Sequence, residues 1–289
     1  MFPDRDLLLR AAAAALPPAL GYRLTARSAG WSAGQRIAWV AAAVEREAAR
    51  LLGDARLARE AGAGFAAAIA CDDLDALTAL AWPRSRRVRH TSVEGLEYLP
   101  PPGPAVLVSF HLSGGFRVFD VLSACGFRPT FLLAEGRPLD RLYLRTLDRA
   151  RRRFFRRALD PAWIATGRGA RARIEEHLGS GGCVVALLDV APAVLGLRDE
   201  APATLFGRPL RLPVGLLRIA ERQGAPVVAF DGRLEGWRRV LRFHPPARSS
   251  APEACLREVL ATFERVIRER PEAWQGWLDI DRFFGNGAG

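Results

Sequence analysis

The sequence contains no lysine. Its 42 basic residues are all arginine, and together with 31 acidic residues they give a formal net charge of +11. A positive field of this size favours acidic partners, such as phosphorylated lipids, an anionic membrane surface, an acidic carrier protein or nucleic acid. The sequence shows no recognition helix, zinc finger or aromatic stacking platform. We therefore expect a lipid, membrane or carrier-protein partner and no nucleic acid.

Cysteine is scarce and scattered. The four cysteines are Cys71, Cys125, Cys183 and Cys255, and no two of them form a CxxC pair. This spacing excludes a disulfide framework and a cysteine-based zinc site, and favours small buried side chains in a reduced compartment. The histidines show no metal-ligand spacing either, so we expect no metal and no cofactor.

Long apolar runs are also missing. The opening stretch "MFPDRDLLLRAAAAALPPALG" carries four charged residues, and Pro17 and Pro18 interrupt it. A membrane-spanning helix needs about 20 apolar residues. No basic segment leads into an uninterrupted apolar core, so we expect no cleaved signal. A cytoplasmic protein fits these features, and the positive charge allows peripheral contact with the inner membrane.

The chain changes character near Pro83. Residues 1–82 are rich in alanine and leucine with helical periodicity, which predicts an N-terminal helical segment. From 83 to 289, apolar runs such as "PAVLVSF" and "CVVALLD" alternate with amphipathic helices. This alternation predicts an α/β domain with a mixed central sheet flanked by helices. Three further expectations are an exposed strand over 87–99, an Arg-rich helix over about 138–158 and an irregular stretch over 190–213.

Four segments resemble a known family when they are taken in order. They are "VEGLEYLPPPGPAVLVSFHLSGGF", "IATGRGARARIEEHLGSGGCVVALLD", "LFGRPLRLPVGLLRIAERQGAPVVAF" and "RERPEAWQGWLDIDRFF". Together they are similar to the bacterial lauroyl/myristoyl (lipid A late) acyltransferases, a branch of the lysophospholipid acyltransferase superfamily. The resemblance implies a glycerolipid acyltransferase-like fold over roughly 90–284.

The resemblance also implies that His111 is a general base, which removes the proton of an attacking hydroxyl. In the family, an acid five residues after the histidine orients the ring. Here that position is Phe116. Asp120 lies one helical turn further and is the candidate replacement; the alternative is an ordinary polar residue on a solvated helix face. Other possible carboxylate donors follow the run "CVVALLD": Asp189, Asp199 and Glu200.

Several residues are candidates for binding substrate. Gly114 and Gly115 suit a strand-to-helix turn whose free N–H groups could receive an oxyanion or a phosphate, although they could equally form only a tight turn. Arg168 and Arg208 fall where the family keeps basic residues near anionic groups of the acceptor, and guanidinium groups bind phosphate or carboxylate well. Asp189 completes this set.

These observations predict an acyltransferase that moves a fatty acyl group from acyl-carrier protein or acyl-CoA to a hydroxyl of a lipid, glycolipid or secondary metabolite. Transfer would be direct, without a covalent enzyme intermediate. Two alternatives stay open: a catalytically impaired homologue that binds an acyl chain or a carrier protein, and an N-acyltransferase. The run "RARRRFFRR" (149–157) fits either a charged helix face or a docking surface for an acidic carrier protein or anionic headgroups.

Overall fold

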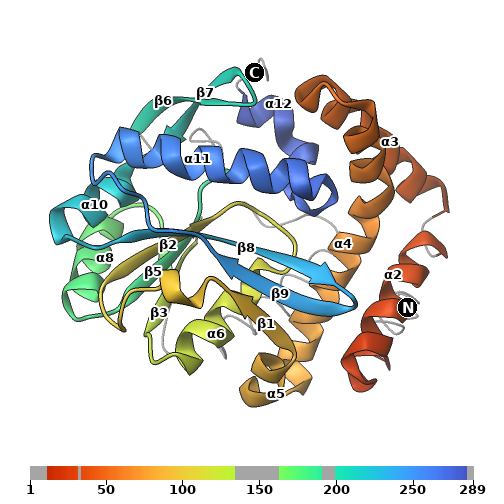
Figure 1. The fold of residues 1–289 in the computed structure, drawn as a ribbon, viewed down its shortest axis with the longest axis horizontal. Helices are drawn as coiled ribbons and strands as arrows, with labels where there is room; N and C mark the ends of the chain where they lie inside the picture. Colours follow the sequence, from red (N-terminus) through yellow and green to blue (C-terminus); the bar gives the residue numbers. More distant parts are fainter. Residues whose placement is uncertain (1–11, 32–33, 134–162, 191–198, 285–289) are drawn as a thin grey trace.

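The computed structural model describes residues 12–31, 34–133, 163–190 and 199–284 (Figure 1). Within them, seven strands form one sheet in the order β1-β9-β8-β2-β5-β3-β4. Their bounds are β1 Thr91–Glu94, β2 Ala105–Ser109, β3 Pro129–Leu133, β4 Ile164–Ala165, β5 Cys183–Leu187, β8 Val227–Glu235 and β9 Arg238–Phe243. β9 runs antiparallel to β8, and the other neighbouring pairs are parallel. The prediction of a mixed α/β sheet is therefore confirmed.

Both faces of the sheet are covered by helices, as Figure 1 shows for α11 on one side and α6 on the other. Val106 and Val108 of β2 pack into the same core as α8, α10 and α11, whereas Ala105 and Leu107 pack with α6 on the opposite face. A strand buried on both faces carries a continuous apolar run, and "PAVLVSF" is such a run. The helix bounds are α6 Val118–Ala124, α8 Ala170–Gly179, α10 Gly215–Gln223 and α11 Pro252–Glu269.

The N-terminal helices pack onto this sheet domain. They are α2 Pro18–Trp31, α3 Gly34–Leu52 and α4 Ala55–Ala81. The carboxylate of Asp54 caps α4 by accepting hydrogen bonds from the backbone of Arg56 and Leu57. Apolar side chains of α3 and α4 belong to the same core as Phe110 after β2. The helices and the sheet are thus joined by shared packing, so α4 can contribute to a site in the sheet domain.

Two stretches differ from the sequence-based expectations. Residues 87–99, expected as one exposed strand, contain the end of α5 (Arg84–Arg89), the short strand β1 and the 3₁₀ turn η1 (Leu96–Tyr98). Residues 190–213, expected to be irregular, contain the hairpin of β6 (Glu200–Leu205) and β7 (Arg208–Pro213). Its two-residue turn places both residues at positive φ, 52° and 74°, which gives the twist that two-residue hairpins favour.

The C-terminal segment returns to the edge of the sheet through η3 (Pro271–Ala273), η4 (Gln275–Asp279) and α12 (Ile280–Phe283). It pairs with the loop that follows β2 through an isolated bridge between Leu112 and Trp274. None of the described helices is both long and apolar enough to cross a bilayer. The Arg-rich helix expected at 138–158, which includes the run 149–157, lies outside the described residues.

Candidate active site

A histidine and an aspartate meet at the ends of two adjacent parallel strands. β2 and β5 pair in register, and Ser109 lies opposite Leu187 where both strands end. His111 lies two residues after Ser109, and Asp189 lies two residues after Leu187. The two side chains are therefore equally far beyond the ends of their strands. The His111 Nδ1 atom lies 2.7 Å from Asp189 Oδ1. Strand pairing, rather than proximity in sequence, brings the two groups together.

Asp189 is held by more than the imidazole. Its oxygens also accept hydrogen bonds from the backbone N–H of His111, at 2.9 Å, and from the indole N–H of Trp274, at 2.9 Å. The Asp189 side chain is only 1% exposed. Because an ionised carboxylate only accepts hydrogen bonds, the ring must donate from Nδ1. The lone pair of the neutral imidazole is then on Nε2, the arrangement that a general base requires.

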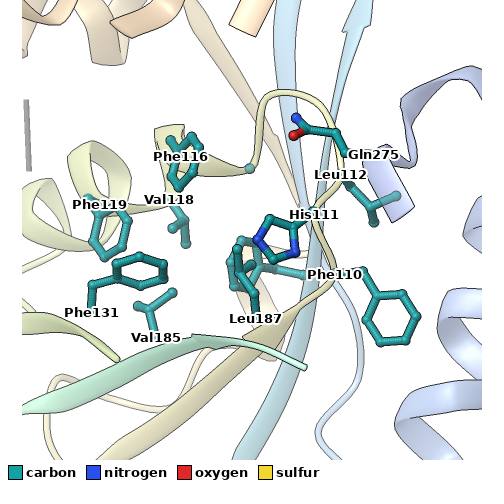
Figure 2. A pocket seen from close by; sticks show the side chains of 12 residues that line it. Phe110, His111, Leu112, Phe116, Val118, Phe119, Phe131, Val185, Leu187 and Gln275 are labelled. Atoms are coloured by element: carbon teal, nitrogen blue, oxygen red, sulfur yellow. The ribbon is translucent and has the colours of Figure 1, made fainter. Parts of the chain in front are cut away.

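The imidazole opens onto an apolar pocket (Figure 2). The His111 side chain is 38% exposed, so its ring is accessible although its acid partner is buried. About 330 Å³ of space, including solvent at the open mouth, lies between its lining side chains. Its described lining consists of Phe110, His111, Leu112, Gly115, Phe116, Val118, Phe119, Phe131, Val185, Leu187, Phe230 and Gln275. A site of this composition suits an apolar group placed next to a base.

No family model matches the chain, and no curated protein matches it. Among solved structures, the crystal structure of the 1-acyl-sn-glycerophosphate (LPA) acyltransferase, PlsC, from Thermotoga maritima is similar at a TM-score of 0.38. The two sequences are 18% identical, and the match covers 71% of this chain and 84% of that chain. A likeness this distant does not assign a reaction, so the function is inferred from the residues of the site.

Asp120, expected as the replacement acid, does not lie beside His111. Its oxygens accept hydrogen bonds from Arg87 at 2.8 and 2.6 Å, and its side chain is 0% exposed. Arg117 adds a further cation, 3.7 Å away. Both expectations for Asp120 are therefore corrected: it neither contacts the imidazole nor lies on a solvated face. It anchors α5 to α6 through a buried ion pair.

Phe116, at the position of the family's acid, is part of the pocket wall. Its ring meets Phe131 edge-on, with the ring centres 6.3 Å apart. Figure 2 shows Phe116 across the pocket from the His111 ring. The carboxylate beside His111 belongs to Asp189, two residues after β5, and the position five residues after the histidine contributes apolar surface instead. The other two candidate acids lie in surface ion pairs: Asp199 contacts Arg218, and Glu200 contacts Arg211.

The two glycines do not provide free N–H groups. The N–H of Gly114 donates to Asp72 Oδ1 at 2.8 Å, and that of Gly115 donates to the carbonyl of Leu112 at 3.2 Å. The expectation that they receive an oxyanion or phosphate is therefore corrected. Gly114 has φ 82°, and a Cβ at this position would lie 3.0 Å from the guanidinium of Arg239. The glycine thus permits a tight turn against a buried arginine.

The two predicted arginines lie away from the pocket lining. Arg168 is exposed in the turn before α8. Arg208 begins β7, and its guanidinium lies over the ring of Phe284, 4.5 Å from the ring centre. The described structure therefore does not place either of them next to the His111–Asp189 pair.

A buried acid on α4 supports the His111 loop. Asp72 Oδ1 accepts hydrogen bonds from the Ser113 hydroxyl, the Gly114 N–H and Arg239, and Asp72 Oδ2 accepts one from Gln275. Burial raises the pKa of Asp72 to about 6, and the nearby Arg239 cation opposes this rise. Arg239 also forms an ion pair with Asp75 on the next turn of α4. The N-terminal helices thus fix the loop that carries the candidate base.

Three of these supporting residues were not assigned a role from the sequence: Asp72, Trp274 and Gln275. For Asp72 a signal was available, because "CDDLD" places acids inside the otherwise apolar helix "GAGFAAAIACDDLDALTAL". Acids in such a context are paired when they are buried. Trp274 is fully buried, at 0% exposure, and its indole N–H also donates a hydrogen bond to the Asp189 carboxylate.

Proposed function

We propose that this chain is an acyltransferase that uses the His111–Asp189 pair to transfer an acyl group from a thioester to a hydroxyl. The observation that carries the proposal is the contact between an accessible imidazole and a buried carboxylate at the mouth of an apolar pocket. Such a pair is a general base with an orienting acid. The apolar lining suits the hydrocarbon part of an acyl group. The resemblance of the four sequence segments supports the same reaction class.

In the proposed reaction, the acceptor hydroxyl donates its proton to His111 Nε2 while its oxygen attacks the thioester carbonyl carbon. Asp189 stabilises the imidazolium that forms. Collapse of the tetrahedral intermediate breaks the carbon–sulfur bond, and the imidazolium returns the proton to the leaving thiolate. The products are an ester and a free thiol, and the neutral imidazole is restored. We propose acyl-carrier protein or coenzyme A as the thiol carrier.

The proposal is tested by following thiol release and ester formation with a panel of acyl thioesters on coenzyme A and on acyl-carrier protein. His111→Ala is expected to lose transfer by at least about 10³-fold, the scale of losing a general base. His177→Ala is the matched control, because His177 lies on α8 and bonds the carbonyl of Arg128 instead of lining the pocket. Equal transfer by the wild type and His111→Ala would refute the proposal. Absence of transfer by the wild type would instead favour the alternative, a protein that binds an acyl chain or a carrier protein at this site.

A further inference from the structure

The loop that begins at His111 is held by two buried carboxylates. At its start, the backbone N–H of His111 donates to Asp189 at 2.9 Å. Further along the loop, Asp72 Oδ1 accepts hydrogen bonds from the Ser113 hydroxyl and from the Gly114 N–H, both at 2.8 Å. Asp72 belongs to α4 and is 4% exposed. An acid of the N-terminal helices therefore holds the turn of this loop.

The C-terminal segment connects the same acid to His111 itself. Gln275 opens η4, and its side-chain Nε2 donates to Asp72 Oδ2 at 2.8 Å. The backbone N–H of Gln275 donates to the carbonyl oxygen of His111, also at 2.8 Å. Figure 2 shows this glutamine beside the loop that follows His111. Asp72 thus acts on the loop at its turn and, through one residue, on the peptide of the candidate base.

Loss of the Asp72 carboxylate would take the acceptor away from the buried Gly114 N–H. A buried donor without an acceptor is costly, so the loop would shift until this N–H met water or another oxygen. Gly114 is three residues from His111, so the shift would reach the imidazole. Misplacing a reacting group by about 1 Å can lower a rate about 10²-fold.

We propose that Asp72 is a positioning residue for acyl transfer, which makes the N-terminal helices part of the catalytic unit. This inference deepens the proposed function and rests on it. The contacts require acceptor oxygens at residue 72 more than they require its charge. Asparagine keeps one oxygen for Ser113 and Gly114, and the Gln275 amide can turn its own oxygen toward the new NH₂ group. Asparagine should therefore replace Asp72 much better than alanine does.

The first test measures kcat and KM of the full chain with the thioester panel described above. Asp72→Ala is expected to lower kcat about 10²-fold and to change KM by less than about threefold. Asp72→Asn should recover at least about tenfold of that loss. Asp54→Ala is the matched control, because it removes the cap at the start of the same helix. It should lower the temperature of unfolding and keep wild-type kcat.

A second readout is independent of catalysis. The chain has four histidines, so the ring NMR signal of His111 is identified by its loss in His111→Ala. Asp72→Ala should displace this signal, whereas Asp72→Asn should leave it near its wild-type position. The signal of His177, whose ring contacts the carbonyl of Arg128, should stay in place in both variants.

Gln275→Met tests the same connection without altering the buried acid, so it decides the question if Asp72→Ala does not fold. It removes one hydrogen bond to Asp72 and keeps the backbone contact with His111. We expect kcat to fall about fivefold, the scale of one hydrogen bond, and the His111 signal to move. An unchanged kcat together with an unmoved signal would refute the inference.

The outcomes separate this inference from the proposed function. Suppose that the wild type transfers acyl groups and His111→Ala does not. The positioning role is then refuted if Asp72→Ala loses kcat only in proportion to its folded fraction, if it changes KM alone, or if Asp72→Asn is no better than Asp72→Ala. The proposed function stands in each case. Absence of transfer by the wild type, or undiminished transfer by His111→Ala, would overturn the proposed function and the catalytic role of Asp72 with it.

Discussion

Replacement of Asp189 by asparagine is the sharpest perturbation of the proposed site. The carboxylate receives three N–H donors, two from His111 and one from Trp274, and is almost fully buried. Asparagine has nearly the same shape but offers one oxygen and an NH₂ group. Wherever that NH₂ group turns, it displaces an acceptor that one of these donors uses. Because the shapes are similar, we expect the fold to tolerate the change and the main effect to be on kcat.

The expected effect on rate follows from the tautomer. If the NH₂ group of the asparagine faces the ring, Nδ1 must accept its hydrogen bond, so the ring hydrogen of the neutral imidazole is on Nε2. A general base needs a lone pair at that position. The negative charge that would stabilise the imidazolium is also lost. Neutralising the acid of a histidine–carboxylate pair lowers kcat by about 10⁴-fold, which corresponds to ~5 kcal/mol of transition-state stabilisation. We expect Asp189→Asn to show a loss of this order, with little change in KM.

The measurement is thiol release at saturating thioester, for the wild type, Asp189→Asn and Asp199→Asn. Asp199 is the control because its side chain is 52% exposed and forms an ion pair with Arg218 on the surface. Its variant should retain wild-type kcat. A kcat for Asp189→Asn within tenfold of the wild type would refute the reasoning, because it would show that the 2.7 Å contact does not set the state of the imidazole.

Three further results are expected. Trp274→Phe removes the indole donor to Asp189 and should lower kcat about tenfold at constant KM. If kcat falls only in proportion to the fraction of folded protein, the tryptophan contributes packing alone. Asp120→Ala removes the carboxylate that pairs with the buried Arg87 cation and should lower the free energy of unfolding in urea by about 3–5 kcal/mol, whereas the folded fraction should keep its activity. The pKa of Asp72 is raised in the folded state, so the contribution of Asp72 to the free energy of unfolding should decline by ~3 kcal/mol as pH rises from about 4 to about 6. Urea titrations of the wild type and Asp72→Asn across that range should show the free energy of unfolding of the wild type falling relative to that of the variant. A rise with pH would contradict the assignment.

Local patterns predicted most of the elements. Runs such as "CVVALLD" are apolar over the length of a strand and end in a polar residue, and helices such as α11 carry an apolar stripe at the helical period. The hairpin of β6 and β7 was missed because Pro202, Pro209 and Pro213 normally interrupt strands. These prolines are tolerated in a two-stranded ribbon, where each strand has an unpaired edge.

The geometry of the candidate site was predicted only in part, for a different reason. The sequence offered His111 as the candidate base and Asp189 among the candidate acids, but Asp120 was preferred as the replacement acid because four residues on a helix give a definite spacing. The pairing of β2 with β5 is a choice among possible strand orders, and no local pattern records it. Likewise, the role of Asp72 depends on where α4 packs. Contacts between distant segments decided both cases.

Because His111 and Asp189 follow separate strands, their alignment depends on the register of β2 and β5. A slip of one residue displaces a strand by about 3.3 Å and breaks a 2.7 Å contact. Substitutions within the sheet that shift β2 relative to β5 should therefore abolish the proposed acyl transfer, although the residues that line the pocket are unchanged. The catalytic rate would then be sensitive to the register of β2 and β5, even when the altered residue is far from the pocket.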